Sequence, residues 1–137
     1  MQIKNQQPPN YRDILDVFPT VPTLKPCFCY GDTIYNPFEI EILPDLEFHE
    51  SIHSKQQSDS PEIWWYTYLH NKTFRLEQEL EAYGGQYAFI LKHIPNNALR
   101  KWKLEHMARS LSSDLYGNII TYGEAESRIK KYAKTNT

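Results

Sequence analysis

The chain has 137 residues, of which 23% are charged and 14% aromatic, and its formal net charge is −2. This length suits one domain with its own core, and the slightly acidic, well-mixed charge argues against nucleic acid as a partner. No apolar run approaches the ~20 residues that span a bilayer, and the start lacks the apolar stretch of a secretory signal, so we expect a cytoplasmic protein.

The N-terminal quarter predicts little regular structure. Residues 1–10 are polar and contain prolines, which is typical of a mobile arm. Residues 11–18 predict a short helix with Asn10 as its cap, ending before a proline. An irregular, proline-spaced segment follows. It leads into the alternating apolar and polar residues 33–42, which predict a strand or hairpin edge interrupted at Pro37.

The only two cysteines, Cys27 and Cys29, are separated by one residue. In an extended segment, such side chains lie roughly 6 to 7 Å apart, at the edge of what a disulfide allows. No second pair of cysteines is present to complete a structural zinc site. We therefore expect plain buried or half-buried thiols.

Residues 49–53 read His-Glu-Ser-Ile-His, inside a predicted helix that starts near Asp45. Histidines four apart share one helical face, so His49 and His53 can both reach a single ion. In zinc hydrolases with this motif, the glutamate, here Glu50, accepts a proton from the attacking water. The alternative is an amphipathic helix with ordinary histidines. A third ligand is needed to decide between the two.

The aromatic segment 62–69 predicts core packing, and after it residues 73–91 repeat apolar residues at helical spacing. This second helix is weakened at Gly84-Gly85, where another backbone is expected to press against it, and the motif helix is a candidate. Glu79 lies 26 residues after His53, and Ala82 follows one turn later on the same face. Glu79 is therefore the candidate third ligand.

Glu77 and Glu81 are rivals for that role. They share one helical face, and Glu79 points roughly 200° away from either, so only one of the two faces can meet the ion.

The last third predicts two more helices. The first is a basic helix from about residue 97 to 112, which ends at a turn around residues 116–118. The second runs to Ile129 from the capping-box string Thr121-Tyr122-Gly123-Glu124. The chain is expected to fray after it, so residues 131–137 predict a second mobile tail.

The pairing of residues 49–53 with Glu79-Leu80-Glu81-Ala82 resembles the gluzincin branch of zinc metallopeptidases, whose third ligand is a glutamate on a second helix. Within that branch it looks most like the small IrrE-like peptidases, whose E-x-x-A pattern these four residues match in register. Residues 30–129 are also similar to uncharacterised small peptidases encoded in tailed-bacteriophage genomes. The strings that carry this similarity are H-E-S-I-H-S-K-Q-Q, F-R-L-E-Q-E-L-E-A-Y and L-S-S-D-L-Y-G-N.

The resemblance implies a Zn²⁺ ion held by His49, His53 and Glu79, with water in the fourth position and Glu50 as general base. Two neutral imidazoles and one carboxylate leave such a complex with net positive charge, which lowers the pKa of the water. A donor to the developing oxyanion is also expected. The candidates for it, which the sequence does not rank, are Tyr83, Tyr87, His106 and Tyr116.

The sequence therefore predicts a single α+β domain over residues 1–137, mainly helical, of the small zincin type and with a short antiparallel sheet. Its predicted function is zinc-dependent hydrolysis of a peptide or protein substrate, in the host cytoplasm if phage-encoded. The alternative is a non-catalytic zinc-binding phage protein that acts as an interaction module, for instance through residues 30–42. An enzyme needs an open fourth ligand position and a cleft beside the sheet edge, where a peptide can add as a strand.

Overall fold

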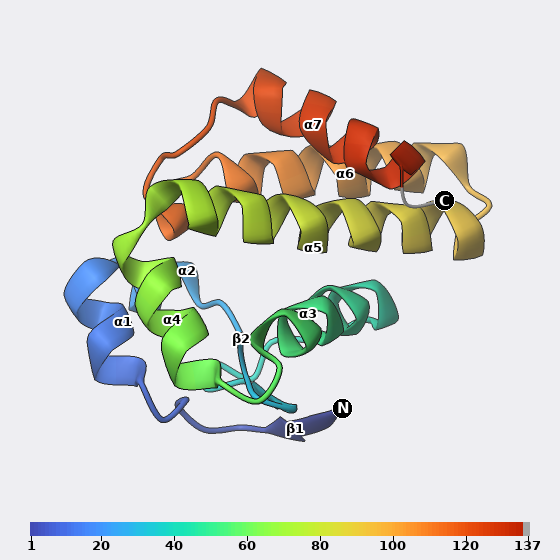
Figure 1. Ribbon diagram of the computed structural model, residues 1–137. Coiled ribbons are helices and arrows are strands. Elements are labelled where there is room, and N and C mark those ends of the chain that lie inside the picture. Colours follow the sequence, from blue (N-terminus) through green and yellow to red (C-terminus); the bar gives the residue numbers. More distant parts are fainter. Residues whose placement is uncertain (136–137) are drawn as a thin grey trace.

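The computed structural model describes residues 1–135, and one long helix organises them (Figure 1). This helix, α5 (Lys72–His93), packs against α3 and α4 on one side and against α6 and α7 on the other. The other elements are β1 (Gln2–Lys4), α1 (Tyr11–Val17), α2 (Val21–Leu24), β2 (Phe28–Tyr30), β3 (Thr33–Tyr35), α3 (Pro44–Gln57), α4 (Pro61–His70), α6 (Asn97–Leu111), the 3₁₀ turn η1 (Asp114–Tyr116) and α7 (Tyr122–Thr135).

The small sheet has the strand order β1-β3-β2. Strands β2 and β3 form an antiparallel hairpin, whose turn passes through Gly31 at φ +65°, a backbone conformation that favours glycine. Strand β1 pairs with β3 in the parallel direction. The predicted mainly helical α+β domain is thus confirmed, but the sheet is mixed and not purely antiparallel.

Both predicted tails contain regular structure. The arm expected over residues 1–10 supplies β1, and the terminal amine of Met1 lies 3.1 Å from Oε2 of Glu47 on α3. At the other end, residues 131–135 continue α7, so the prediction that the chain frays there is wrong. Residues 136–137 lie outside the described residues.

The predicted helices are present, with ends that the local sequence explains. Pro44 and Pro61 begin α3 and α4, where a missing backbone N–H costs nothing. The side chains of Asn71 and Asn96 cap α5 and α6 by accepting a backbone N–H. Asn10 precedes α1 as predicted, but its side chain makes no capping hydrogen bond. The short helix α2 was not predicted, and the segment that forms α4 was predicted only to pack in the core.

Two glycines let α5 approach its neighbours closely. A Cβ atom on Gly85 would lie 2.3 Å from Cδ1 of Ile52 on α3, and one on Gly84 would lie 2.4 Å from Cβ of Tyr132 on α7. The predicted close approach to the motif helix is confirmed at Gly85, and α7 is a second close neighbour. Gly85 therefore sets the spacing between the two helices that carry the candidate ligands, and Gly84 sets the spacing between α5 and α7.

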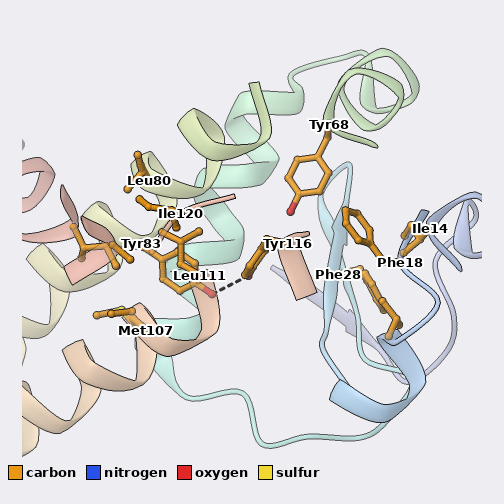
Figure 2. Close-up of a cluster of buried hydrophobic side chains, with 14 of the residues drawn as sticks. Ile14, Phe18, Phe28, Tyr68, Leu80, Tyr83, Met107, Leu111, Tyr116 and Ile120 are labelled. Carbon is orange, nitrogen blue, oxygen red and sulfur yellow. Dashed lines mark hydrogen bonds between the residues drawn. The ribbon is translucent and has the colours of Figure 1, made fainter. Parts of the chain in front are cut away.

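One apolar cluster joins the helical part of the molecule to its N-terminal part (Figure 2). Tyr116, from the turn η1, lies beside Tyr83 of α5, and the cluster continues to Phe18 and Phe28. Arg75, which is 4% exposed, donates to three main-chain carbonyl oxygens of α4 and η1 and so fixes these segments. Within residues 1–135, no helix is long and apolar enough to cross a membrane.

Candidate metal centre

The side chains of His49, His53 and Glu79 meet in the interior between α3 and α5. Their nearest ligand atoms form a small triangle. Nε2 of His53 lies 3.1 Å from Nε2 of His49 and 3.2 Å from Oε1 of Glu79, and the His49–Glu79 distance is 3.3 Å. Tetrahedral ligands bound about 2.0–2.1 Å from zinc lie about 3.3–3.4 Å apart. The three residues can therefore hold a metal ion.

Two glutamines orient the histidines. The amide nitrogen of Gln86 donates to Oδ2 of Asp45 (2.8 Å), so its oxygen faces Nδ1 of His49 (3.0 Å) and accepts that N–H. The amide nitrogen of Gln56 likewise donates to a main-chain oxygen and to Glu81, and its oxygen accepts from Nδ1 of His53 (2.8 Å). Both imidazoles thus carry their proton on Nδ1 when neutral, which leaves Nε2 free for a metal.

The support for His49 extends to α6. Asp45, which the sequence suggested as a helix-starting acid, is only 7% exposed, and its Oδ1 lies 2.9 Å from Nζ of Lys103. The series Lys103, Asp45, Gln86 and His49 therefore connects α6 to a candidate ligand. Such partners set both the orientation and the basicity of a metal-binding imidazole.

Tyr68 orients the candidate carboxylate ligand. Its hydroxyl donates to Oε2 of Glu79 at 2.6 Å, which leaves Oε1 to face the two histidines. Burial alone would raise the pKa of Glu79, but His53 and hydrogen bonds from both imidazoles lower it far below its ordinary value. Burial would lower the pKa of His53, and the Glu79 charge instead raises it to about 9. Without metal, this is a buried ion pair.

The rival carboxylates face other surroundings. Glu77 is exposed, and Glu81 is exposed on α5, where it accepts a hydrogen bond from Gln56. The structure thus brings Glu79, and neither rival, to the two histidines.

Glu50 lies beside this triangle and is 6% exposed. Burial raises the pKa of its carboxyl, and the two nearby histidines oppose that rise. The thiol of Cys27 lies 3.6 Å from its Oε1. Both cysteines are free thiols as predicted, but the position of Cys27 against Glu50 was not predicted.

Two cavities meet at the candidate centre. An interior cavity of about 60 Å³ borders Glu50, His49, His53 and Glu79. A cleft of about 360 Å³, between the start of α3 and α6, borders His49 and Glu50. Both residues line both spaces, so the cleft extends to the side chains of His49 and Glu50.

None of the residues that line the cleft belongs to a strand, although Pro26 and Cys27, directly before β2, do line it. The outer edge of β2 is also covered. The carbonyl oxygen of Cys29 accepts from Nε2 of Gln57 (2.8 Å) and from Nε1 of Trp65 (3.0 Å), and the amide of Gly31 donates to Oε1 of Gln57 (2.7 Å). The expectation that a peptide adds to the sheet as an extra strand is therefore wrong at the edge of β2.

The four candidate oxyanion donors occupy different places. Tyr83, His106 and Tyr116 line the cleft, and Tyr116 also borders the interior cavity; Tyr87 lines neither space. The hydroxyls of Tyr83 and Tyr116 lie 2.7 Å apart (Figure 2). Burial raises the pKa of both phenols, so both stay protonated. Tyr83 donates to Oγ of Ser110 (3.1 Å), so the proton between the two phenols comes from Tyr116.

Sequence reasoning missed the residues that support the ligands, namely Gln56, Gln86, Tyr68 and Asp45. A partial signal exists for two of them. Gln86 follows Glu79 by seven residues, which is two helical turns, and Gln56 follows His53 by three. Tyr68 carries no such signal, because it comes from a different helix.

Comparison with known proteins identifies no family for this arrangement of residues. The chain matches no protein-family model, no curated protein and no solved structure. The case for a function therefore rests on the arrangement of these residues.

Proposed function

We propose that this protein is a zinc-dependent peptidase in which His49, His53 and Glu79 hold the ion. The observation that carries the proposal is that a buried acid, Glu50, lies next to the three ligands at the meeting point of the interior cavity and the cleft. A zinc ion bound there would act as a Lewis acid that polarises the substrate carbonyl and lowers the pKa of water.

Glu50 would move the protons. As water adds to the peptide carbonyl, Glu50 takes one proton from it and later delivers that proton to the departing amine, so the C–N bond breaks without a free charge on nitrogen. Its buried position favours this role because burial raises the pKa of its carboxyl toward the working range of a general base.

Tyr116 is the proposed donor to the developing oxyanion. Among the four candidates, it alone borders both the interior cavity and the cleft. In the structure its hydroxyl donates to that of Tyr83, and it would turn this proton to the oxyanion when a substrate is bound. Tyr116→Phe should lower kcat by about 10²- to 10³-fold with zinc content unchanged, and Tyr87→Phe, outside both spaces, should not.

A second candidate function is a metal site that only stabilises the fold. The observation in its favour is the depth of the centre, since the three ligands and Glu50 are 3–6% exposed. The two functions differ in what Glu50 does. In a structural site, its loss should leave every biochemical property except stability unchanged.

The deciding experiment compares wild type with Glu50→Gln, which is close in shape but cannot take a proton. Elemental analysis should find about one zinc per chain in both, and His49→Ala should lose it. Cleavage of a peptide library by wild type should fall at least about 10²- to 10⁴-fold in Glu50→Gln. Glu47→Gln, on the same helix and outside both cavities, is the matched control and should cleave like wild type.

Two results would contradict the proposal. Stoichiometric zinc in His49→Ala after dialysis against a weak chelator would remove the metal assignment. Identical cleavage profiles for wild type and Glu50→Gln would remove the peptidase and leave the stabilising metal site.

A further inference from the structure

Three exposed apolar side chains surround the mouth of the cleft. Leu24 at the end of α2, Leu43 just before α3, and Trp102 on α6 are 44%, 43% and 57% exposed, and all three line the cleft. They come from three separate segments of the chain. A ring of large apolar side chains around a cavity is a feature of sites that bind an apolar group.

The interior of the cleft continues this character. Ile40, Leu46, Met107 and Leu115 contribute to its wall, and its volume of about 360 Å³ exceeds that of any single amino-acid side chain. The space is therefore wide enough for a large side chain next to Glu50 and His49.

The charges in the cleft disfavour an acidic occupant. The ammonium group of Lys103 is already paired with Asp45 at 2.9 Å, and Asp45 also holds Gln86. Glu41 and Glu50 add two further acids to the lining. A carboxylate entering the cleft would lose its hydration and gain no unpaired lysine or arginine. An apolar side chain has no such desolvation cost.

Trp102 is held in place for contact with an occupant. Its ring lies parallel to the imidazole of His106, with an interplanar angle of 7° and a centroid distance of 5.4 Å. This stack fixes the indole at the edge of the cleft, so a ligand does not have to order it on binding.

We propose that the cleft binds a bulky apolar side chain of the substrate, of the leucine, methionine or phenylalanine type, adjacent to the bond that is cleaved. Trp102 is the residue that selects it. The inference rests on the proposed peptidase function and adds the substrate class to it.

The test uses zinc-loaded Glu50→Gln, which cannot turn a ligand over, and four probes that share one metal-binding group. These are the hydroxamates of leucine, phenylalanine, alanine and aspartate, titrated by calorimetry. The leucine and phenylalanine compounds should bind about 10-fold or more tightly than the alanine compound, and the aspartate compound should bind most weakly. Adding Trp102→Ala should remove most of this preference while leaving the affinity for the alanine compound unchanged.

The matched control is Tyr66→Ala, which removes another exposed aromatic ring (69%) from α4, outside the cleft. It should retain the full preference. Leu43→Ala, which truncates another exposed lining residue, should weaken the preference in the same direction as Trp102→Ala and serves as a second variant. In the wild-type enzyme, Trp102→Ala should raise KM for apolar substrates more than it lowers kcat.

The outcomes separate the two proposals. Equal affinity for the leucine and alanine compounds, tightest binding of the aspartate compound, or equal effects of Trp102→Ala and Tyr66→Ala would overturn the apolar cleft while leaving the metal centre intact. If no hydroxamate binds, the metal centre itself is wrong, and the inference built on it is overturned as well.

Discussion

Replacing Gln86 by leucine removes both hydrogen bonds of this side chain while keeping a side chain of similar size. The N–H at Nδ1 of His49 and Oδ2 of Asp45 both lose their partner in the interior. Each buried polar group left in this way costs about 1–3 kcal/mol. Losing the partner of a metal-binding histidine typically weakens metal affinity about 10- to 100-fold, or about 1.4–2.8 kcal/mol. Both losses should therefore be measurable.

The assay is competition for zinc against a chromophoric chelator, together with urea unfolding of the metal-free protein. Gln78→Leu is the matched control, because it removes a glutamine of the same helix whose oxygen accepts from Nε1 of Trp64 (2.7 Å) and contacts neither histidine. The control should lose stability and keep its zinc affinity. Wild-type affinity in Gln86→Leu, or an equal loss in Gln78→Leu, would refute the role assigned to Gln86.

Three further predictions concern stability. The pKa of His53 is raised from 6.5 to about 9, so its contribution to metal-free stability is full below pH 6.5 and is lost as pH rises through 9. The pKa of Glu79 is lowered, so its contribution is present above pH 4.5 and is lost as the solution becomes acidic. Urea unfolding in EDTA should therefore show stability falling from pH 6.5 to 9, and a flat profile would contradict the ion pair. Gly84→Ala should cost about 1–3 kcal/mol despite the better helix propensity of alanine, because its Cβ would lie 2.4 Å from Cβ of Tyr132, and a raised melting temperature would argue against this close packing. Arg75→Met should cost about 3 kcal/mol or more in thermal unfolding, since three buried carbonyl oxygens lose their donor, and wild-type stability would show that these bonds contribute nothing net.

The candidate ligands were predictable because their geometry is local. Two histidines four apart on a helix must share a face, and Glu79 with Ala82 fixes one face of a second helix in the same way. The glycine pair added the information that this second helix is approached closely, and Gly85 does lie against Ile52. Local periodicity thus predicted both helices and their contact.

The supporting residues depend on contacts that no local pattern contains. Gln86 and Gln78 are the same residue type on the same helix, yet only Gln86 meets a histidine, which lies 37 residues away. The parallel pairing of β1 is equally non-local, and strands of three residues are too short to show a period. The cleft was expected at a strand edge because edges commonly bind peptides, whereas Gln57 occupies that edge at β2.

The covered edge of β2 has a consequence for how the protein behaves when it loses metal. Gln57 lies one turn beyond His53 on the same helix, and its amide bonds the carbonyl oxygen of Cys29 in β2 and the N–H of Gly31 just after the strand. An uncovered strand edge is a template for aggregation. If an ion held by His49, His53 and Glu79 also steadies the last turns of α3, its removal should expose this edge, and a chelated sample should then scatter light through association at β2 at temperatures below its melting transition.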